Sequence, residues 1–131
     1  MSLSNTYENR VYDWLYRAGQ TPARPAGVWV GLITAVTDAE AGTFTEVTGG
    51  SYARQPVTMS APTDGAGSNS ADVVFPAPTA AWGTVTHFAL FDAVTAGNPI
   101  SAAVPLSAAR VINNGDAAPR FAAGSLTASQ T

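Results

Sequence analysis

Apolar and polar residues alternate in short runs over most of the sequence, and this pattern constrains the fold more than any other feature. In residues 27–36, Val28, Val30 and Leu32 fall on one side of an extended chain, while Trp29 falls on the other. Gly, Pro, Asn and Asp separate such runs about every 8–12 residues, which is typical of sandwiches and barrels. We therefore predict an all-β fold, an antiparallel β-sandwich of jelly-roll or barrel-like form. Further strands are expected at 43–47, 51–60, 71–75, 83–93, 98–106, 108–114 and 115–128.

Turn residues and prolines divide this pattern further. The pair Asn114-Gly115 predicts a tight hairpin turn, because both residues tolerate a positive φ. Pro56, Pro99 and Pro105 predict strand edges or strand ends, because proline has no N–H to donate to a sheet. The side chains that we expect in the core are Val28, Val30, Leu32, Val74, Val85, Phe88, Leu90 and Phe121.

The first segment of the chain has a different period. In "LSNTYENRVYDWLYRAGQTP", apolar residues recur at spacings of three and four, beginning at Leu3 and Tyr7. Ser4 or Asn5 can cap the start of a helix, and a glycine and a proline follow its end. We predict a single N-terminal helix at about residues 4–18.

The opposite side of this helix carries Tyr12 and Tyr16, with Arg17 beside them. Tyrosine and arginine are enriched in binding interfaces, so these three residues are candidate contacts with a partner. The alternative is that the helix covers a sheet as a lid, with the tyrosines packed at its rim.

Composition narrows the range of functions. The 131 residues, with a net charge of −3, predict one domain spanning 1–131, and the charge does not favour nucleic-acid binding. The sequence has no apolar run long enough to span a membrane and no cysteine for disulfides or thiolate metal sites. Only 11% of residues are charged, against about 25% in average soluble domains. This low charge suits a protein packed against neighbours, or it follows from the codon usage of a GC-rich genome.

The one histidine lies in an apolar run, "AAWGTVTHFALFDA", together with Trp82. Both faces of this run are apolar around His87, and Asp92 falls five residues later on the opposite face, about 17 Å away along a strand. A histidine without a neighbouring nucleophile, acid or further ligands lacks the parts of a catalytic or metal site. We therefore assign His87 and Trp82 structural roles, and expect no enzyme activity, no metal and no cofactor.

Two further segments contain candidate residues. The polar stretch 61–70 is expected to be a flexible loop, in which Asp64 and Asn69 are candidate contacts, because its spacing matches neither a phosphate loop nor a calcium loop. In "TEVTGGSYARQPV", Arg54 is expected to have a structural role, paired with a carboxylate or with backbone carbonyls, and Glu46 is the nearest candidate across the two glycines. The alternative is a free arginine on the surface.

The order of these segments resembles a family of small tailed-phage virion proteins that are commonly labelled phage tail-fibre proteins. The resemblance covers nearly the whole chain, and its most specific parts are "TEVTGGSYAR" and "FPAPTAAWGTVTHFALFD". The polar end "SLTASQT" departs from the apolar last strand of relatives, which leaves the length of that strand open. The family offers no catalytic residues to transfer. Similar β-sandwich proteins serve as capsid cement or decoration proteins.

The resemblance implies a non-enzymatic structural protein of the virion, assembled in the host cytoplasm. We expect a capsid cement protein that binds the major capsid protein, as a homo-oligomer or a many-copy array, because a chain of this size without repeats does not suit a fibre shaft. The alternative is a tail-tip, tail-fibre or baseplate component with tail proteins as partners. A second alternative is a carbohydrate-binding module that uses Trp29 and Trp82 as a stacking platform.

Overall fold

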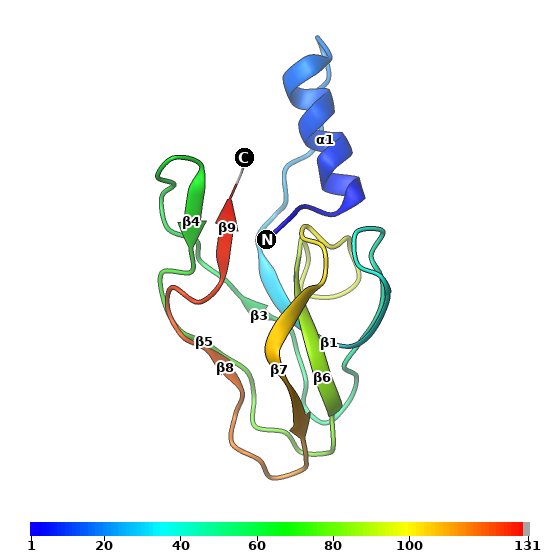
Figure 1. The fold of residues 1–131 in the computed structure, drawn as a ribbon, viewed down its shortest axis with the longest axis vertical. Helices are drawn as coiled ribbons and strands as arrows, with labels where there is room; N and C mark the ends of the chain where they lie inside the picture. Colours follow the sequence, from blue (N-terminus) through cyan, green and yellow to red (C-terminus); the bar gives the residue numbers. More distant parts are fainter. Residues whose placement is uncertain (130–131) are drawn as a thin grey trace.

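Strand β1 (Trp29–Asp38) lies at the centre of the main sheet. In this computed structural model, which describes residues 1–129, the sheet has the order β2-β1-β6-β7, and β3 pairs with β1 beside β2. All pairings are antiparallel, so the predicted all-β sandwich with one N-terminal helix is confirmed (Figure 1). The elements are α1 (Asn5–Tyr16), β2 (Thr43–Glu46), β3 (Gln55–Pro56), β4 (Ala66–Ser68), β5 (Val73–Val74), β6 (Gly83–Phe91), β7 (Val104–Ile112), β8 (Arg120–Phe121) and β9 (Thr127–Ser129).

The pairing of β1 with β6 gives the sheet two apolar faces. Val30 lies opposite Leu90 and Leu32 opposite Phe88, so these four side chains point to the same face. On the other face, Ile33, Ala89 and Phe91 form a smaller buried cluster, partly covered by Val36 and Phe44. A strand with two apolar faces is a central strand, which is the role that the sequence around His87 predicts.

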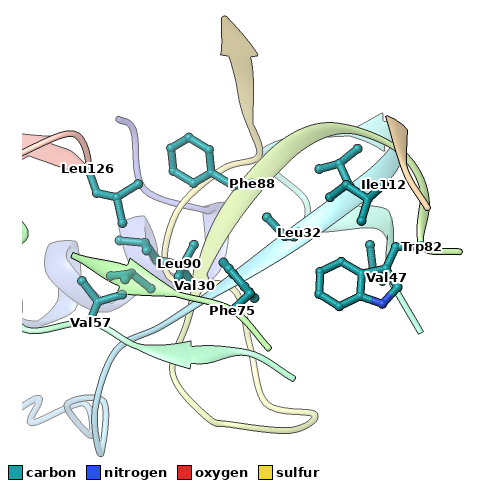
Figure 2. Packing of buried hydrophobic residues seen from close by; sticks show 12 residues of the cluster. Val30, Leu32, Val47, Val57, Phe75, Trp82, Phe88, Leu90, Ile112 and Leu126 are labelled. Atoms are coloured by element: carbon teal, nitrogen blue, oxygen red, sulfur yellow. The ribbon is translucent and has the colours of Figure 1, made fainter. Parts of the chain in front are cut away.

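The main core lies between this sheet and two small two-stranded sheets, β5-β8 and β4-β9. Figure 2 shows Phe75 and Trp82 packed beside the sheet residues, with Leu126 closing the core from the C-terminal part of the chain. The buried members of this cluster are Val30, Leu32, Val47, Val57, Val73, Phe75, Trp82, Val85, Phe88, Leu90, Ile112 and Leu126.

Most of the predicted core is confirmed. Five of the eight predicted residues are buried, and Val28 and Phe121 are partly buried against the core. The prediction for Val74 is wrong, because this side chain is 50% exposed. In the two-residue strand β5, Val73 faces the core, and the alternation along a strand then turns Val74 outward.

The prediction of two strands, at 98–106 and 108–114, is wrong, because the structure has one strand in this region, β7. The register of β7 with β6 shifts between the pairs Val85–Arg110 and His87–Pro105, so Thr86 alone faces residues 106–109. The bulge begins directly after Pro105, which has no N–H to donate to the sheet.

The turn at Asn114-Gly115 forms, with the Asp116 N–H donating to the Asn113 carbonyl at 3.2 Å. The prediction of a hairpin is nevertheless wrong, because the chain leaves the main sheet after this turn. The next strand, β8, pairs with β5.

Candidate interaction surface

Helix α1 is attached to the body by its first turn. The Ser4 backbone N–H donates to the Ile100 carbonyl at 2.8 Å, and its hydroxyl donates to the Pro99 carbonyl at 2.6 Å. The Asn5 N–H donates to the Glu40 carbonyl at 2.9 Å. Ser4 also caps the helix, since its side chain accepts from the Tyr7 N–H. The base of the helix is therefore fixed in position and direction.

A polar contact between Tyr7 and Asp92 strengthens this base. The Tyr7 hydroxyl donates to an Asp92 carboxylate oxygen at 2.8 Å, and the Arg10 guanidinium donates to the same hydroxyl. Burial, together with the hydrogen bond to Asp92, raises the pKa of Tyr7 to about 12. Burial works to raise the pKa of Asp92, but hydrogen bonds from Asn98 and Tyr7 outweigh it and lower this pKa below its usual range.

Beyond its first turn, the helix projects past the strands (Figure 1). Tyr7 is its one buried residue within the described chain, and the side chains of Tyr12, Trp14, Leu15 and Tyr16 are 56–72% exposed. The lid alternative is therefore wrong. The apolar stripe that the spacing indicates does exist, but it does not lie on the sheet after Tyr7.

The two predicted tyrosines lie together on this surface. The ring centroids of Tyr12 and Tyr16 are 5.1 Å apart and the rings are tilted against each other. Arg17 instead bonds to Asp13, one turn earlier, at 2.9 Å. We define the aromatic helix face as Val11, Tyr12, Trp14, Leu15 and Tyr16. An open groove of about 750 Å³ runs along it, with residues 2–3 and Ser129 on its other side.

The sequence prediction missed Trp14 and Leu15 as surface residues. Their spacing from Tyr7 placed them on the presumed buried side of the helix. Hydrophobic periodicity identifies an apolar face, but it does not tell whether the same chain covers that face.

The stretch 61–70 gives a different result from the one expected. Asp64 is exposed in a tight turn, but Asn69 is only 2% exposed, so its prediction as a surface contact is wrong. Its amide donates to the carbonyls of Ala71 and Ala122 and accepts from the Leu126 N–H. Asn69 therefore joins this segment to the C-terminal part of the chain. The segment also contains β4, which pairs with β9.

The predicted pair between Arg54 and Glu46 forms, and it is the centre of a larger junction. Two guanidinium nitrogens of Arg54 bond to the two carboxylate oxygens of Glu46, at 2.9 and 2.8 Å. A third donates to the carbonyls of Ala93 and Ala96, both at 2.8 Å. The guanidinium carbon lies 3.6 Å from the centre of the Phe91 ring. We call this set, together with Tyr52, the Arg54 junction.

Tyr52 belongs to the junction although the sequence did not single it out. Its hydroxyl donates to Glu46 and accepts from the Leu32 N–H at 2.9 Å, so it supplies a missing sheet partner between β2 and β3. Burial, with the hydrogen bond to Glu46, raises the pKa of Tyr52 well above its usual value. The hydroxyl therefore remains a neutral donor.

Trp82 is only 4% exposed, and its indole N–H donates to the Gly50 carbonyl at 2.9 Å. The carbohydrate platform predicted from Trp29 and Trp82 is therefore wrong, because a buried ring cannot stack on a sugar. The contact requires glycine at position 50, where φ is +59° and an added Cβ would lie 2.8 Å from the indole nitrogen.

His87 is half-buried in β6, with its Nδ1 2.8 Å from the Thr86 hydroxyl. In the sheet it lies opposite Ile33 on β1 and Pro105 on β7. Across residues 1–129, the His, Asp and Glu side chains form no group of three that could hold a metal ion. The helix that the structure describes is too short and too polar to cross a membrane.

These observations define the class of the protein. It is a small β-sandwich protein that presents one aromatic helix to its surroundings. The family model described as podophage GP4 fiber I protein gp80 matches residues 2–129, so the chain belongs to this family of phage fibre proteins. The family supports a structural role in the virion, which the sequence resemblance implies. No curated protein matches the sequence of this chain.

Proposed function

We propose that the protein is a non-enzymatic structural component of a phage fibre and that it is held in the virion through α1. The observation that carries the proposal is the aromatic helix face on a helix whose base is fixed to the body. Contact of such a face with water raises the free energy of the system, and a neighbour that covers the face lowers it. The fibre description of the family is the reason for preferring a fibre over other virion locations.

The low charge of the chain favours a contact of this kind. With only 11% charged residues, the surface has few charges to desolvate when it is covered. Aromatic burial then supplies most of the binding free energy. We therefore expect the attachment to persist at high salt, unlike an electrostatic contact, which ions would screen.

Capsid cement is the second candidate function, and the same low charge favours it. In that case the helix would contact the major capsid protein on the outside of the head. The two candidates differ only in where the protein is found, so one experiment distinguishes them.

The experiment is to separate heads and tails of purified phage particles and to identify the proteins of each fraction by mass spectrometry. The fibre proposal expects the protein in the tail fraction, after washes at low salt and at about 1 M salt. Its presence in the head fraction alone would replace the fibre proposal with the cement candidate. Its absence from both, together with hydrolysis of a host glycan that His87→Ala abolishes, would overturn the structural role.

A further inference from the structure

The aromatic helix face has little support from its own chain. Bonds from the body reach residues 4, 5, 7 and 10 of the helix region, whereas the last two turns carry the exposed aromatic side chains. A helix of 12 residues is marginal in water when it stands alone. The last two turns therefore gain stability if an apolar surface covers them.

The size of the face indicates what can cover it. Aromatic side chains have about 150–250 Å² to bury, so side chains that are 56–72% exposed leave on the order of 450 Å² of apolar surface on four residues. This is within the range of the largest patches on monomers, about 300–600 Å², which are often functional. Trp14 and Tyr16 are two residues apart and lie on different sides of α1, so a partner helix seated on the groove covers only part of this surface, and the walls of the groove add to it. A pair of such faces therefore falls in the size range of weak interfaces, below about 1,200 Å² in total.

The charges around the helix do not oppose contact between identical copies. Residues 5–17 carry two acidic and two basic side chains, so the net charge is zero. Arg17 bonds to Asp13 on the side opposite Leu15, and Arg10 lies against the Tyr7 ring and donates to the Ala23 carbonyl. Glu8 is the one charged residue that lines the groove in the described part of the chain.

We infer that the aromatic helix face binds the same face of a second copy of this chain, with the two helices antiparallel. This inference rests on the proposed contact role of α1 and names its partner. In a parallel pair, the two Glu8 side chains would meet at the same level of the interface. In an antiparallel pair that places Glu8 level with Leu15 of the other copy, they lie at opposite ends, about 10 Å apart along the axis, which exceeds the screening length of about 8 Å at physiological salt.

The first experiment measures the mass of the purified chain in solution by sedimentation and light scattering, over a range of protein concentrations. We expect a dimer, and we expect Leu15→Asp to convert it into a monomer, because it places a charge within the apolar contact. The matched control is Val111→Asp. Val111 is 58% exposed, as Tyr12 is, but it lies at the end of β7 far from α1 (Figure 1). The control should remain a dimer.

The second experiment uses the absence of cysteine from the sequence. Single substitutions Glu8→Cys and Leu15→Cys should each give little disulfide-linked dimer under mild oxidation, because the ends of an antiparallel helix pair do not meet their own copies. An equal mixture of the two variants should give a linked heterodimer. Efficient linking of Leu15→Cys with itself would overturn the antiparallel arrangement.

The inference and the proposed function fail in different ways. A wild-type chain that stays monomeric at all concentrations, yet is found in phage tails, would overturn the self-contact and leave the structural role intact. A stable dimer that is absent from phage particles would retain the self-contact and overturn the role. Equal loss of the dimer in Leu15→Asp and Val111→Asp would also overturn the inference, because it would place the contact outside the helix.

Discussion

The Arg54 junction buries a charged side chain, whereas the aromatic helix face leaves apolar side chains exposed. At the junction, a charged side chain is withdrawn from water, and each guanidinium nitrogen has an acceptor among Glu46, Ala93 and Ala96. On the helix, large apolar side chains remain in water although the spacing of the stripe would suit burial. The junction is complete within one chain, whereas the helix face is not. The difference separates the part of the molecule that maintains the fold from the part that is available to a neighbour.

A substitution in the core of the sandwich should lower the free energy of unfolding more than any change at the Arg54 junction or on the helix. Leu90→Ala removes a side chain that is 4% exposed, between the sheet and the β5-β8 side of the core. We expect the free energy of unfolding to fall by about 2–5 kcal/mol, from lost burial and from the cavity left behind. Urea unfolding followed by tryptophan fluorescence measures it, with Val74→Ala as a control that should change little. A loss under about 0.5 kcal/mol would contradict the assigned core.

A substitution in the Arg54 junction should cause the next largest loss in the free energy of unfolding. Arg54→Lys keeps the charge but loses the two-point contact with Glu46 and the flat packing on Phe91. We expect a loss of about 1.5–3 kcal/mol in the free energy of unfolding, the range for hydrogen bonds to charged groups. The matched control is Arg17→Lys, whose bond to Asp13 is exposed and should contribute under about 0.5 kcal/mol. Equal effects of the two substitutions would remove the distinction between the junction and the helix.

A smaller effect is expected where the helix joins the body. The pKa of Tyr7 is raised from 10.0 to about 12, so the neutral hydroxyl is favoured in the fold and its stabilisation is lost as the pH rises from 10 towards 12. The pKa of Asp92 is lowered, so its contribution is present above the usual carboxyl pKa and is lost as the pH falls through the lowered value. Thermal unfolding over a pH series should show both losses. Tyr7→Phe should reduce the alkaline one, leaving the part that Tyr52 contributes.

The aromatic helix face should have the smallest effect on stability and the largest on assembly. Tyr16→Ser changes a side chain that is 72% exposed, so the free energy of unfolding of the separated chain should change by less than about 0.5 kcal/mol. Its incorporation into phage particles should nevertheless fall, and the attachment of the wild-type chain should survive about 1 M salt. If Tyr16→Ser destabilised the chain but were still incorporated into phage particles, Tyr16 would serve the fold and not the contact with a neighbour.

The sequence predicts the body better than it predicts the surface. Alternation along residues 28–32 identifies the inward side of this strand, because one face of it must be buried. In β6 both faces are apolar, so alternation alone does not select the inward side there. The pairing of Glu46 with Arg54 follows from their scarcity as charges and from the two glycines between them. The predictions of a buried Val74 and of a hairpin at Asn114-Gly115 are wrong because each rests on a short local pattern. A two-residue strand carries too little pattern to fix its side, and a local turn does not determine which strand follows it.

The helix shows the physical limit of such predictions. The stripe through Tyr7, Val11 and Trp14 is visible in the sequence, but burial depends on where the body lies relative to the helix. That position is set by long-range bonds, from Ser4 to Pro99 and from Tyr7 to Asp92, which have no local signal. The same reason explains Asn69, whose burial depends on segments more than 50 residues away.

The bulge in β7 protects the edge of the main sheet from pairing with another chain. β7 is the last strand in the order of the main sheet, and an uninterrupted outer strand is a template on which another chain can add a strand of its own. Here the outer strand carries Pro105 followed by four residues that face Thr86 alone, so its donors and acceptors do not form a regular ladder. Copies of this chain at high local concentration can therefore lie side by side without their sheets fusing into larger, insoluble ones.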